Sequence, residues 1–576
     1  MISVMKKRIS LWSVLGAIVF MGLQVLGTLA LPNITSDIVN KGITRGDTHY
    51  IIIAGIRMLG ASIFIVVVSF FNVLLASQAS QQLGQNLRND IYRKVLYMSN
   101  NEFDQIGTSS LITRTTNDVV QIQNVTLMML RMMIMAPIMM IGASFMAYQK
   151  NQHLTEIFIF ILPVLILVVG VVMYFAVPLF KVMQKKIDRL NLVFREGLTG
   201  VRVIRAFRRD DWEQKRFDLA NQDYTHNAQK AFSIIATMYP LIILVMSGMN
   251  ISITWLGAKY IAQRSMAVGD LIAFMTYAVQ ILMSCMMLSM IFVFVPRAQA
   301  SATRINTILK MKSELKENTQ EKKLDQSAAA LEFSQVSFSY QGAESPAVKN
   351  VSFQVHAGQT VGIIGGTGSG KTTLVNLISR VYDVQSGKVR LNGHDVRDLS
   401  LQEINDHVAL VPQKAVLFKG TIRDNLKYGD LTASDEQLWH ALKIAQAADF
   451  IKNEQGLDTK VEQGGDNFSG GQKQRLAIAR ALVKDASIYI FDDSFSALDF
   501  KTDALLRKAL LNDERLKQKV LVIVSQRIST IADAQVIVVL DHGQMVGCGT
   551  HQQLKDSNAT YQEIMQSQIK GAAIND

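Results

Sequence analysis

Cysteine is nearly absent from this sequence, since its 576 residues include only Cys285 and Cys548. Two cysteines so far apart in the chain provide no disulfide framework. Charge is also scarce inside the long hydrophobic runs, where Arg57 and Arg131 lie near run ends and their long side chains can reach the polar boundary. No group of charges within these runs resembles a fixed ion-binding site.

The net charge of +12 would suit a nucleic-acid-binding protein, but the distribution of the basic residues argues against one. Lys and Arg fall largely in the segments between hydrophobic runs, as expected at the cytoplasmic face of a membrane. We therefore expect no nucleic acid among the partners of this protein and expect a lipid bilayer instead.

Hydrophobic runs dominate the first 310 residues. The run 11–32 would reach roughly 33 Å as a helix, enough to cross the hydrocarbon core of a bilayer. Its length, and the runs that follow it, argue against a cleaved signal peptide. The sequence therefore predicts six membrane-spanning helices, near 11–32, 51–77, 126–148, 155–178, 232–257 and 271–296.

Two connections between the runs, 78–125 and 179–231, are long and basic, whereas the others are short. This asymmetry places both long connections, both termini and the C-terminal part of the chain in the cytoplasm, as in a multi-pass protein of the plasma membrane. A continuous helix over 51–100 would be roughly 75 Å long and would project beyond the bilayer. We expect the turns near 103–112 and 207–216 to press on a soluble domain.

The domain boundaries follow from a change in composition. Residues 310–328 are charged and weakly patterned, which predicts a linker, although a solvated extension of the sixth helix would look similar. The predicted organisation is a transmembrane domain over 1–309, a linker over 310–328 and a soluble domain over 329–576.

The soluble domain contains the stretch TVGIIGGTGSGKTTLVNLISR, which reads as a strand, a glycine-rich loop and a helix and fits G-x-x-x-x-G-K-[ST]. Such a loop wraps backbone N–H groups around phosphate, and the helix N-terminus adds partial positive charge. The lysine reaches the β- and γ-phosphates, and the threonine hydroxyl binds Mg²⁺. The phosphate-binding residues predicted here are Gly365, Gly366, Thr367, Gly368, Ser369, Gly370, Lys371, Thr372 and Thr373.

Two further motifs follow in the soluble domain. The apolar strand SIYIF leads into Asp492, whose carboxylate is expected to hold Mg²⁺ through water; without a phosphate loop, a turn-capping aspartate would be the preferred interpretation. The stretch DNFSGGQKQRLAIARAL is strongly helical after Ser469, which predicts a helix N-cap. The adjacent Gly470 and Gly471 also suit a second phosphate-binding helix start.

The phosphate loop, NFSGGQ and IYIFDDSFSALD together closely resemble the ATP-binding cassette (ABC) family, and the chain as a whole resembles an ABC exporter half-transporter. The resemblance implies a membrane α-helical six-span domain plus an α/β P-loop ABC ATPase domain, with ATP and Mg²⁺ as cofactors. In this family two cassettes meet head to tail. Each ATP then lies between the phosphate loop of one chain and the signature of the other, so a second half-transporter is implied.

The resemblance also assigns roles to individual positions. Tyr340 matches the aromatic residue that stacks on adenine, and Gln413 matches the glutamine that senses Mg²⁺. The implied metal-binding set is Thr372, Gln413 and Asp492. The signature residues, which complete the partner's nucleotide site, are Ser469, Gly470, Gly471 and Gln472.

Two positions depart from the family pattern. Asp493 stands where the family has a catalytic Glu, and the loss of one CH₂ withdraws the carboxylate by on the order of 1 Å, which can cost roughly 10²-fold in rate. Gln526 stands where the family has a His; its amide can donate a hydrogen bond but cannot carry charge. With Lys371, these are the predicted catalytic residues, and ATP is expected to bind here and to hydrolyse slowly.

The chain therefore resembles the degenerate-site subunit of bacterial heterodimeric multidrug exporters. We expect an ATP hydrolysis-coupled exporter of lipophilic compounds that works by alternating access, paired with a different chain that carries the catalytic Glu and His. Methionines crowd the third and sixth runs, which suits either a cavity for lipophilic cargo or simple lipid-compatible filling. A homodimeric lipid or peptide exporter and an ATP-gated channel or sensor are the alternatives.

Overall fold

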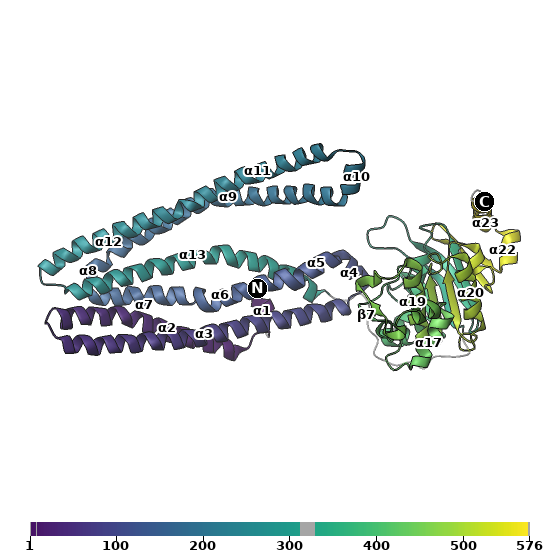
Figure 1. The fold of residues 1–576 in the computed structure, drawn as a ribbon, viewed down its shortest axis with the longest axis horizontal. Helices are drawn as coiled ribbons and strands as arrows, with labels where there is room; N and C mark the ends of the chain where they lie inside the picture. The colour runs from purple at the N-terminus through teal and green to yellow at the C-terminus, as the bar shows by residue number, and fades with distance from the viewer. Residues whose placement is uncertain (1, 7, 312–328, 574–576) are drawn as a thin grey trace. The chain divides into compact units, whose positions relative to one another are not determined.

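The computed structural model describes residues 2–6, 8–311 and 329–573, which form two compact units (Figure 1). One unit contains residues 1–96 and 109–310 and is built from helices. The other combines residues 97–108 with 311–576 and contains a large β-sheet. Of the predicted linker, residues 312–328 lie outside the described residues, and the sixth long helix continues to Lys310.

The second unit is organised around a ten-stranded mixed sheet in the order β5–β4–β1–β2–β12–β11–β3–β10–β9–β6. The neighbours β11, β3, β10, β9 and β6 run parallel to one another. The strands of this sheet are β1 (Leu331–Phe338), β2 (Val348–Val355), β3 (Thr360–Gly365), β4 (Ser386–Leu391), β5 (His394–Asp395), β6 (Val408–Val411), β9 (Ile488–Asp492), β10 (Val520–Val524), β11 (Val536–Asp541) and β12 (Gln544–Gly549).

A smaller sheet pairs β7 (Gly420–Thr421) with β8 (Lys460–Val461). The helices of this unit are α4 (Asn100–Ile106), α14 (Lys371–Ile378), η4 (Val396–Asp398), α15 (Leu401–His407), α16 (Ile422–Leu426), α17 (Asp435–Ile444), α18 (Ala448–Lys452), η5 (Gly456–Asp458), η6 (Gln463–Gly465), α19 (Gly470–Val483), α20 (Phe500–Asn512), α21 (Ile528–Ile531), α22 (His551–Ser557) and α23 (Ala559–Ala573).

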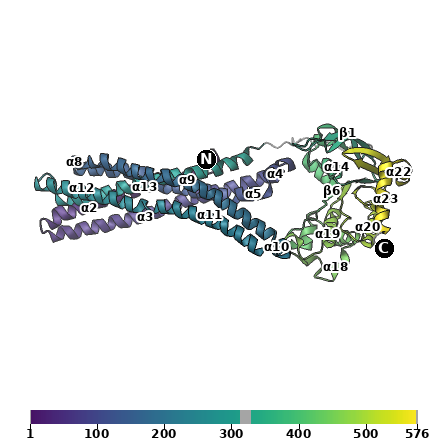
Figure 2. The same ribbon diagram turned by 90° about the horizontal axis from the view of Figure 1, so that it is seen from above.

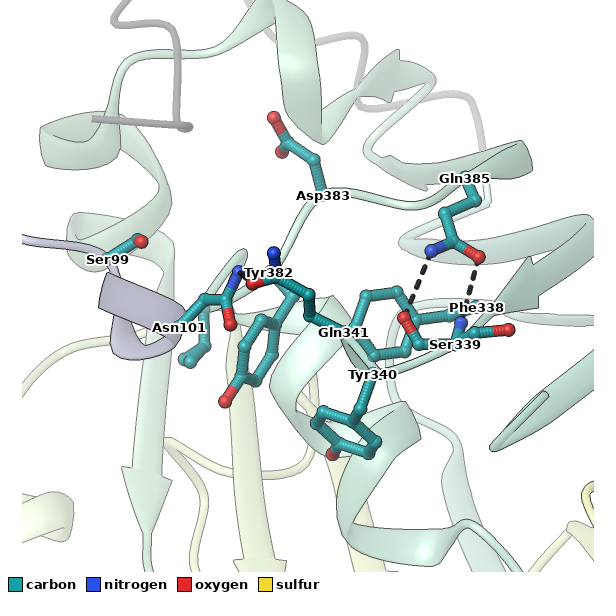
Figure 3. A pocket seen from close by; sticks show the side chains of 10 residues that line it. Ser99, Asn101, Phe338, Ser339, Tyr340, Gln341, Tyr382, Asp383 and Gln385 are labelled. Atoms are coloured by element: carbon teal, nitrogen blue, oxygen red, sulfur yellow. Dashed lines mark hydrogen bonds between the residues drawn. The ribbon is translucent and has the colours of Figure 1, made fainter. Parts of the chain in front are cut away.

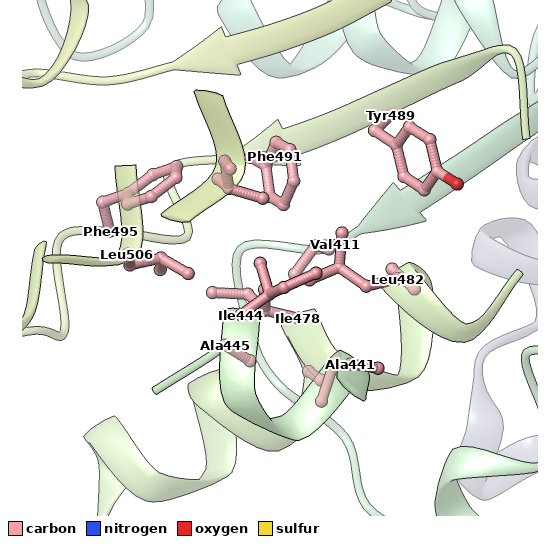
Figure 4. Close-up of a cluster of buried hydrophobic side chains, with 14 of the residues drawn as sticks. Val411, Ala441, Ile444, Ala445, Ile478, Leu482, Tyr489, Phe491, Phe495 and Leu506 are labelled. Atoms are coloured by element: carbon pink, nitrogen blue, oxygen red, sulfur yellow. The ribbon is translucent and has the colours of Figure 1, made fainter. Parts of the chain in front are cut away.

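The parallel strands are buried on both faces, which is why they read in the sequence as unbroken apolar runs. Alternate residues of β9 enter different cores. Tyr489 and Phe491 pack with α17, α19 and α20 (Figure 4), whereas Ile488 and Ile490 pack with α14 and β1. The helices α14 and α19 therefore cover opposite faces of the sheet.

Six helices of the described residues are long and apolar enough to cross a membrane, which confirms the six predicted spans. The chain therefore has the build of a multi-pass membrane protein. The helical segments are α1 (Ile2–Met5), α2 (Leu11–Asp37), η1 (Ile38–Ile43), α3 (Thr48–Leu96), α5 (Thr108–Thr113), η2 (Arg114–Asp118), α6 (Val119–Met128), η3 (Met129–Met133), α7 (Met135–Lys150), α8 (Gln152–Thr155), α9 (Ile157–Thr199), α10 (Val201–Ala206), α11 (Asp210–Ala236), α12 (Met238–Ala262) and α13 (Val268–Lys310).

The long cytoplasmic connections are helical, as predicted. The helix α3 is unbroken for 49 residues, about 74 Å, and ends at Leu96. Figure 1 shows α9 and α11 side by side with α10 at their tip. The predicted turn at 207–216 is confirmed for residues 207–209, but the rest of that range is helical. The helix α11 already begins at Asp210, because acidic residues in its first turn are stabilised by the positive end of the helix dipole.

Polar groups tie three spans together where α2 ends, α7 ends and α13 begins. Lys150 Nζ and Ser36 Oγ both donate to Asp270 Oδ1, at 2.8 and 2.7 Å. The backbone N–H of Gly269 donates to Asn40 Oδ1 at 2.8 Å. A Cβ atom at Gly269 would lie 2.4 Å from the Ser36 carbonyl oxygen and 2.7 Å from Asn40 Oδ1. Only glycine at this position lets α13 approach α2 so closely.

The variant Gly269→Ala should be destabilised. The added methyl forces the first turn of α13 away from α2, and overpacking of this kind costs about 1 to 3 kcal/mol. The melting temperature of the purified protein in detergent should fall. The matched control is Gly60→Ala in α3, where a Cβ meets no atom within 4 Å. An equal melting temperature for Gly269→Ala and the parent would contradict the close-packed junction.

Candidate ATP-binding site

The predicted nucleotide residues converge because four parallel strands end at one edge of the sheet. The strands β3, β10, β9 and β6 are successive neighbours, so the loops that follow them meet outside their carboxyl ends. In open α/β sheets this edge is where ligands bind. The loops carry the phosphate-binding motif after β3, Gln526 after β10, Asp493 after β9 and Gln413 after β6.

The phosphate loop has a conformation that requires glycine. Gly368 and Gly370 have φ of 79° and 97°, in the left-handed region. A Cβ atom at Gly370 would lie 2.5 Å from the Ala347 carbonyl oxygen, and one at Gly365 would lie 2.2 Å from the Leu540 carbonyl oxygen. The loop therefore exposes its backbone N–H groups at the start of α14 without a side chain in the way.

Among the described residues, neither Lys371 nor Ser369 of the loop hydrogen-bonds to a carboxylate. Lys371 Nζ donates to the carbonyl oxygens of Gly365 and Gly366 at 2.9 and 2.7 Å. Burial lowers the pKa of Lys371, although the carboxylates of Asp493 and Asp492 oppose the shift. Ser369 Oγ is buried and has no hydrogen-bond partner among the described residues. A phosphate oxygen in this cradle would satisfy both groups.

The side chains expected to hold Mg²⁺ meet at the end of β9. Thr372 Oγ1 donates to Asp492 Oδ1 at 3.3 Å, and Asp492 is almost fully buried. Burial raises the pKa of the Asp492 carboxyl, and a bound cation would favour its ionised form. One hydroxyl and one carboxylate suit Mg²⁺, which keeps several waters and takes phosphate oxygens as further ligands. Gln413 instead donates its amide to Asp493 Oδ2, at 3.5 Å.

The two positions that depart from the family pattern touch each other. Gln526 Nε2 donates to Asp493 Oδ2 at 3.2 Å. Asp493 is 7% exposed, and burial raises the pKa of its carboxyl. Its backbone has φ of 47°, uncommon for a residue with a side chain, and its N–H donates to the Val524 carbonyl oxygen of β10 at 3.0 Å. The neighbouring carboxylates therefore face different partners: Asp492 faces Thr372, and Asp493 faces two glutamine amides.

Tyr340 is held beside the phosphate loop. Its hydroxyl lies 3.1 Å from Thr373 Oγ1, in the first turn of α14. Its ring stands edge-on to those of Phe338 and Tyr382, with interplanar angles of 85° and 89°. The ring remains 37% exposed, which leaves surface on which a base can stack.

The signature residues form a helix start, which confirms the predicted N-cap. Ser469 Oγ accepts from the Gln472 N–H at 3.3 Å, and Gln472 Oε1 accepts from the Ser469 N–H at 2.9 Å. This capping box begins α19, and Figure 2 shows α19 and α14 in different parts of the unit. The structure therefore brings the other predicted site residues together but leaves Ser469, Gly470, Gly471 and Gln472 on another side of the domain.

A further set of residues near the site was not predicted. A cavity of about 340 Å³ lies beside Tyr340, between α4 and the loop after β1 (Figure 3). Gln341 Oε1 accepts hydrogen bonds from Asn101 Nδ2 and Gln105 Nε2 of α4, at 3.3 and 2.5 Å. The helix α4 belongs to the first predicted turn, but only the fold reveals that it contacts the residue next to Tyr340.

Sequence comparison adds independent evidence. The profile of the ABC transporter transmembrane region matches residues 14–285, and that of the ABC transporter ATPase region matches residues 348–496. A Mycobacterium tuberculosis protein described as an uncharacterized ABC transporter ATP-binding protein is 38% identical over 96% of both chains. The ATP-dependent lipid A-core flippase of Pseudomonas aeruginosa is 33% identical, over 86% of this chain and 82% of that protein.

Structure comparison agrees on the fold. A bacterial Atm1-family ABC exporter with ATP bound is similar with a TM-score of 0.80, at 24% identity, over 96% of this chain and 98% of the other. Profiles, relatives and fold thus agree along nearly the whole length. The chain belongs to the ABC transporter family, as an exporter half-transporter with a six-span membrane domain and an ATPase domain that binds ATP, normally with Mg²⁺.

Proposed function

We propose that this chain is one subunit of a heterodimeric exporter of lipophilic compounds and that its own phosphate loop forms a slow ATP site. The observation that carries this proposal is the direct contact between Asp493 and Gln526. Both residues depart from the family pattern, and both belong to one cluster, so they affect the same step.

Nucleotide binding at this pocket is supported by an intact cradle. The glycine-dependent loop, Lys371 and the buried Ser369 hydroxyl surround the position of the phosphates. Thr372 and Asp492 would hold Mg²⁺, and the exposed ring of Tyr340 would stack on the base. Because none of these groups hydrogen-bonds to residue 493 or 526, we expect ATP affinity to be retained.

Hydrolysis requires more than binding. A water attacks the γ-phosphorus, its proton moves to a base, and the bond to the β–γ bridging oxygen breaks to leave ADP and phosphate. Asp493 is one CH₂ shorter than Glu, and its Oδ2 already accepts from Gln526 and Gln413. The amide of Gln526 supplies no positive charge to the γ-phosphate. The carboxylate of Asp493 thus lies farther from the attacking water than that of a Glu would, and the charge on the γ-phosphate is stabilised less.

The signature serves the other site of the assembly. Because α14 and α19 cover opposite faces of the sheet, one chain cannot close its own phosphate loop with its own signature. Ser469, Gly471 and Gln472 complete the pocket of a different chain that carries the catalytic Glu and His. Hydrolysis there resets the transporter, while ATP in the slow site keeps the cassettes partly engaged.

Coupling to the membrane domain is supported by α4. Its Asn101 and Gln105 contact Gln341, the residue after Tyr340, so closure around the base can move the first cytoplasmic turn. Opening outward then follows from alternating access. Met139, Met249 and Met266 pack in the core of the helical unit. Flexible methionine side chains of this kind would suit a membrane domain that rearranges around varied apolar cargo.

A homodimeric lipid exporter is the second candidate. It is favoured by the similarity to proteins named lipid A-core flippases, which covers 86% of this chain for the Pseudomonas aeruginosa protein. In that case both ATP sites of the assembly would be identical and would contain Asp493 and Gln526.

The double variant Asp493→Glu, Gln526→His should hydrolyse ATP at this chain's pocket about 10²-fold faster than the parent, because the base regains its reach and the charge returns. Photoreactive azido-ATP labelled on the α- or the γ-phosphate reports each chain separately on a gel. The fall in the ratio of γ- to α-label on this chain gives its hydrolysis rate. The control is Asp485→Glu, an exposed position paired with Lys519. Equal rates for the double variant and the parent would refute the slow-site proposal.

The partner should be a different protein. Affinity purification of this chain from its native membrane should yield a second six-span chain in equal amount. That chain should carry Glu at the position that matches Asp493 and His at the position that matches Gln526. Mass spectrometry of the purified assembly identifies it. An assembly containing only copies of this chain would support the homodimeric lipid exporter instead.

A further inference from the structure

The helix α23 is fastened to the ATPase unit along one face. Tyr561 is fully buried, and Ile564 and Met565 pack against the core that contains α17, α19 and α20. The Tyr561 hydroxyl also lies 2.7 Å from His551 Nδ1. Gln568 follows Tyr561 by about two helical turns, so it lies on the same face as these anchors.

The side chain of Gln568 holds the backbone of the loop that carries Gln526. Its Nε2 donates to the Gln526 carbonyl oxygen at 2.7 Å, and its Oε1 accepts from the Ile528 N–H at 3.0 Å. Ile528 begins α21, whose N-cap residue, Arg527, makes no side-chain capping bond. Gln568 therefore supplies, from a distant helix, an acceptor for one of the backbone N–H groups in the first turn of α21 that have no partner within the helix.

We propose that Gln568 is a positioning residue of the ATP site, which acts through Gln526 on Asp493. The carbonyl of Gln526 is fixed by Gln568, while its side-chain amide donates to Asp493 Oδ2 at 3.2 Å. Gln526, in the loop between β10 and α21, is thus held at both its backbone and its side chain. The C-terminal helix thereby sets where the amide of residue 526 meets the γ-phosphate and the base.

The two hydrogen bonds give this role a chemical signature. A carboxylate at position 568 keeps the acceptor for the Ile528 N–H but loses the donor for the Gln526 carbonyl, against which it places negative charge. Gln568→Glu keeps one bond but adds repulsion, so it should also slow hydrolysis relative to the parent. Gln568→Ala loses both bonds and adds no repulsion. The inference rests on the proposed role of Gln526 but not on whether the pocket is slow.

The experiment uses the full-length transporter, purified together with any partner chain. Azido-ATP labelling measures hydrolysis on each chain separately. Gln568→Ala should slow hydrolysis at this chain's pocket by about 10-fold, as expected for a misplaced group, with α-phosphate labelling unchanged. The matched control is Gln562→Ala in the same helix, whose Nε2 donates to the Lys555 carbonyl oxygen and should leave the rate unchanged. Melting temperatures of all variants separate a loss of folding from a loss of positioning.

A double-mutant cycle tests whether Gln568 acts through Gln526. If Gln568 acts through Gln526, then Gln568→Ala should cost nothing further in the Gln526→Ala background. Additive losses, an unchanged rate in Gln568→Ala, or an equal loss in Gln562→Ala would each overturn the proposal. Fast ATP hydrolysis at this pocket in the parent would refute only the slow-site proposal. The cycle would still test Gln568, because it compares each variant with its own parent.

Discussion

The site depends on the burial of β9 between β10 and β6. Both faces of this strand are packed, so the chain leaves the sheet at a fixed point, and two successive carboxylates emerge there in different directions. Asp492 is still part of the strand and meets Thr372. Asp493 turns at positive φ, and its N–H bonds to the end of β10, where its side chain meets Gln526. The different contacts of the two carboxylates follow from this exit geometry.

The same sheet explains why one chain is incomplete. Its two faces are covered by different helices, and the helix after the phosphate loop and the helix after the signature lie on opposite ones. Burial of both faces stabilises the domain and at the same time keeps the two phosphate-binding helix starts apart. A complete nucleotide site, with a phosphate loop beside a signature, therefore requires a second cassette.

Two peripheral helices reach the site through its neighbours. The helix α4 bonds to Gln341, next to Tyr340, and α23 bonds to the backbone of Gln526. Each contact joins a segment far away in the sequence to a residue beside the predicted ATP site.

The sequence by itself determined the features that depend on neighbours along the chain. Span length and hydropathy predicted the six helices, glycine spacing predicted the phosphate loop, and Ser469 before a strongly helical run predicted the helix start, because each depends on residues a few positions apart. Only the tertiary structure decided the contacts of Gln568 with residues 526–528, of α4 with Gln341 and of Gly269 with Ser36. These join segments far apart in sequence, and their geometry exists only once the sheet and the helical bundle have packed.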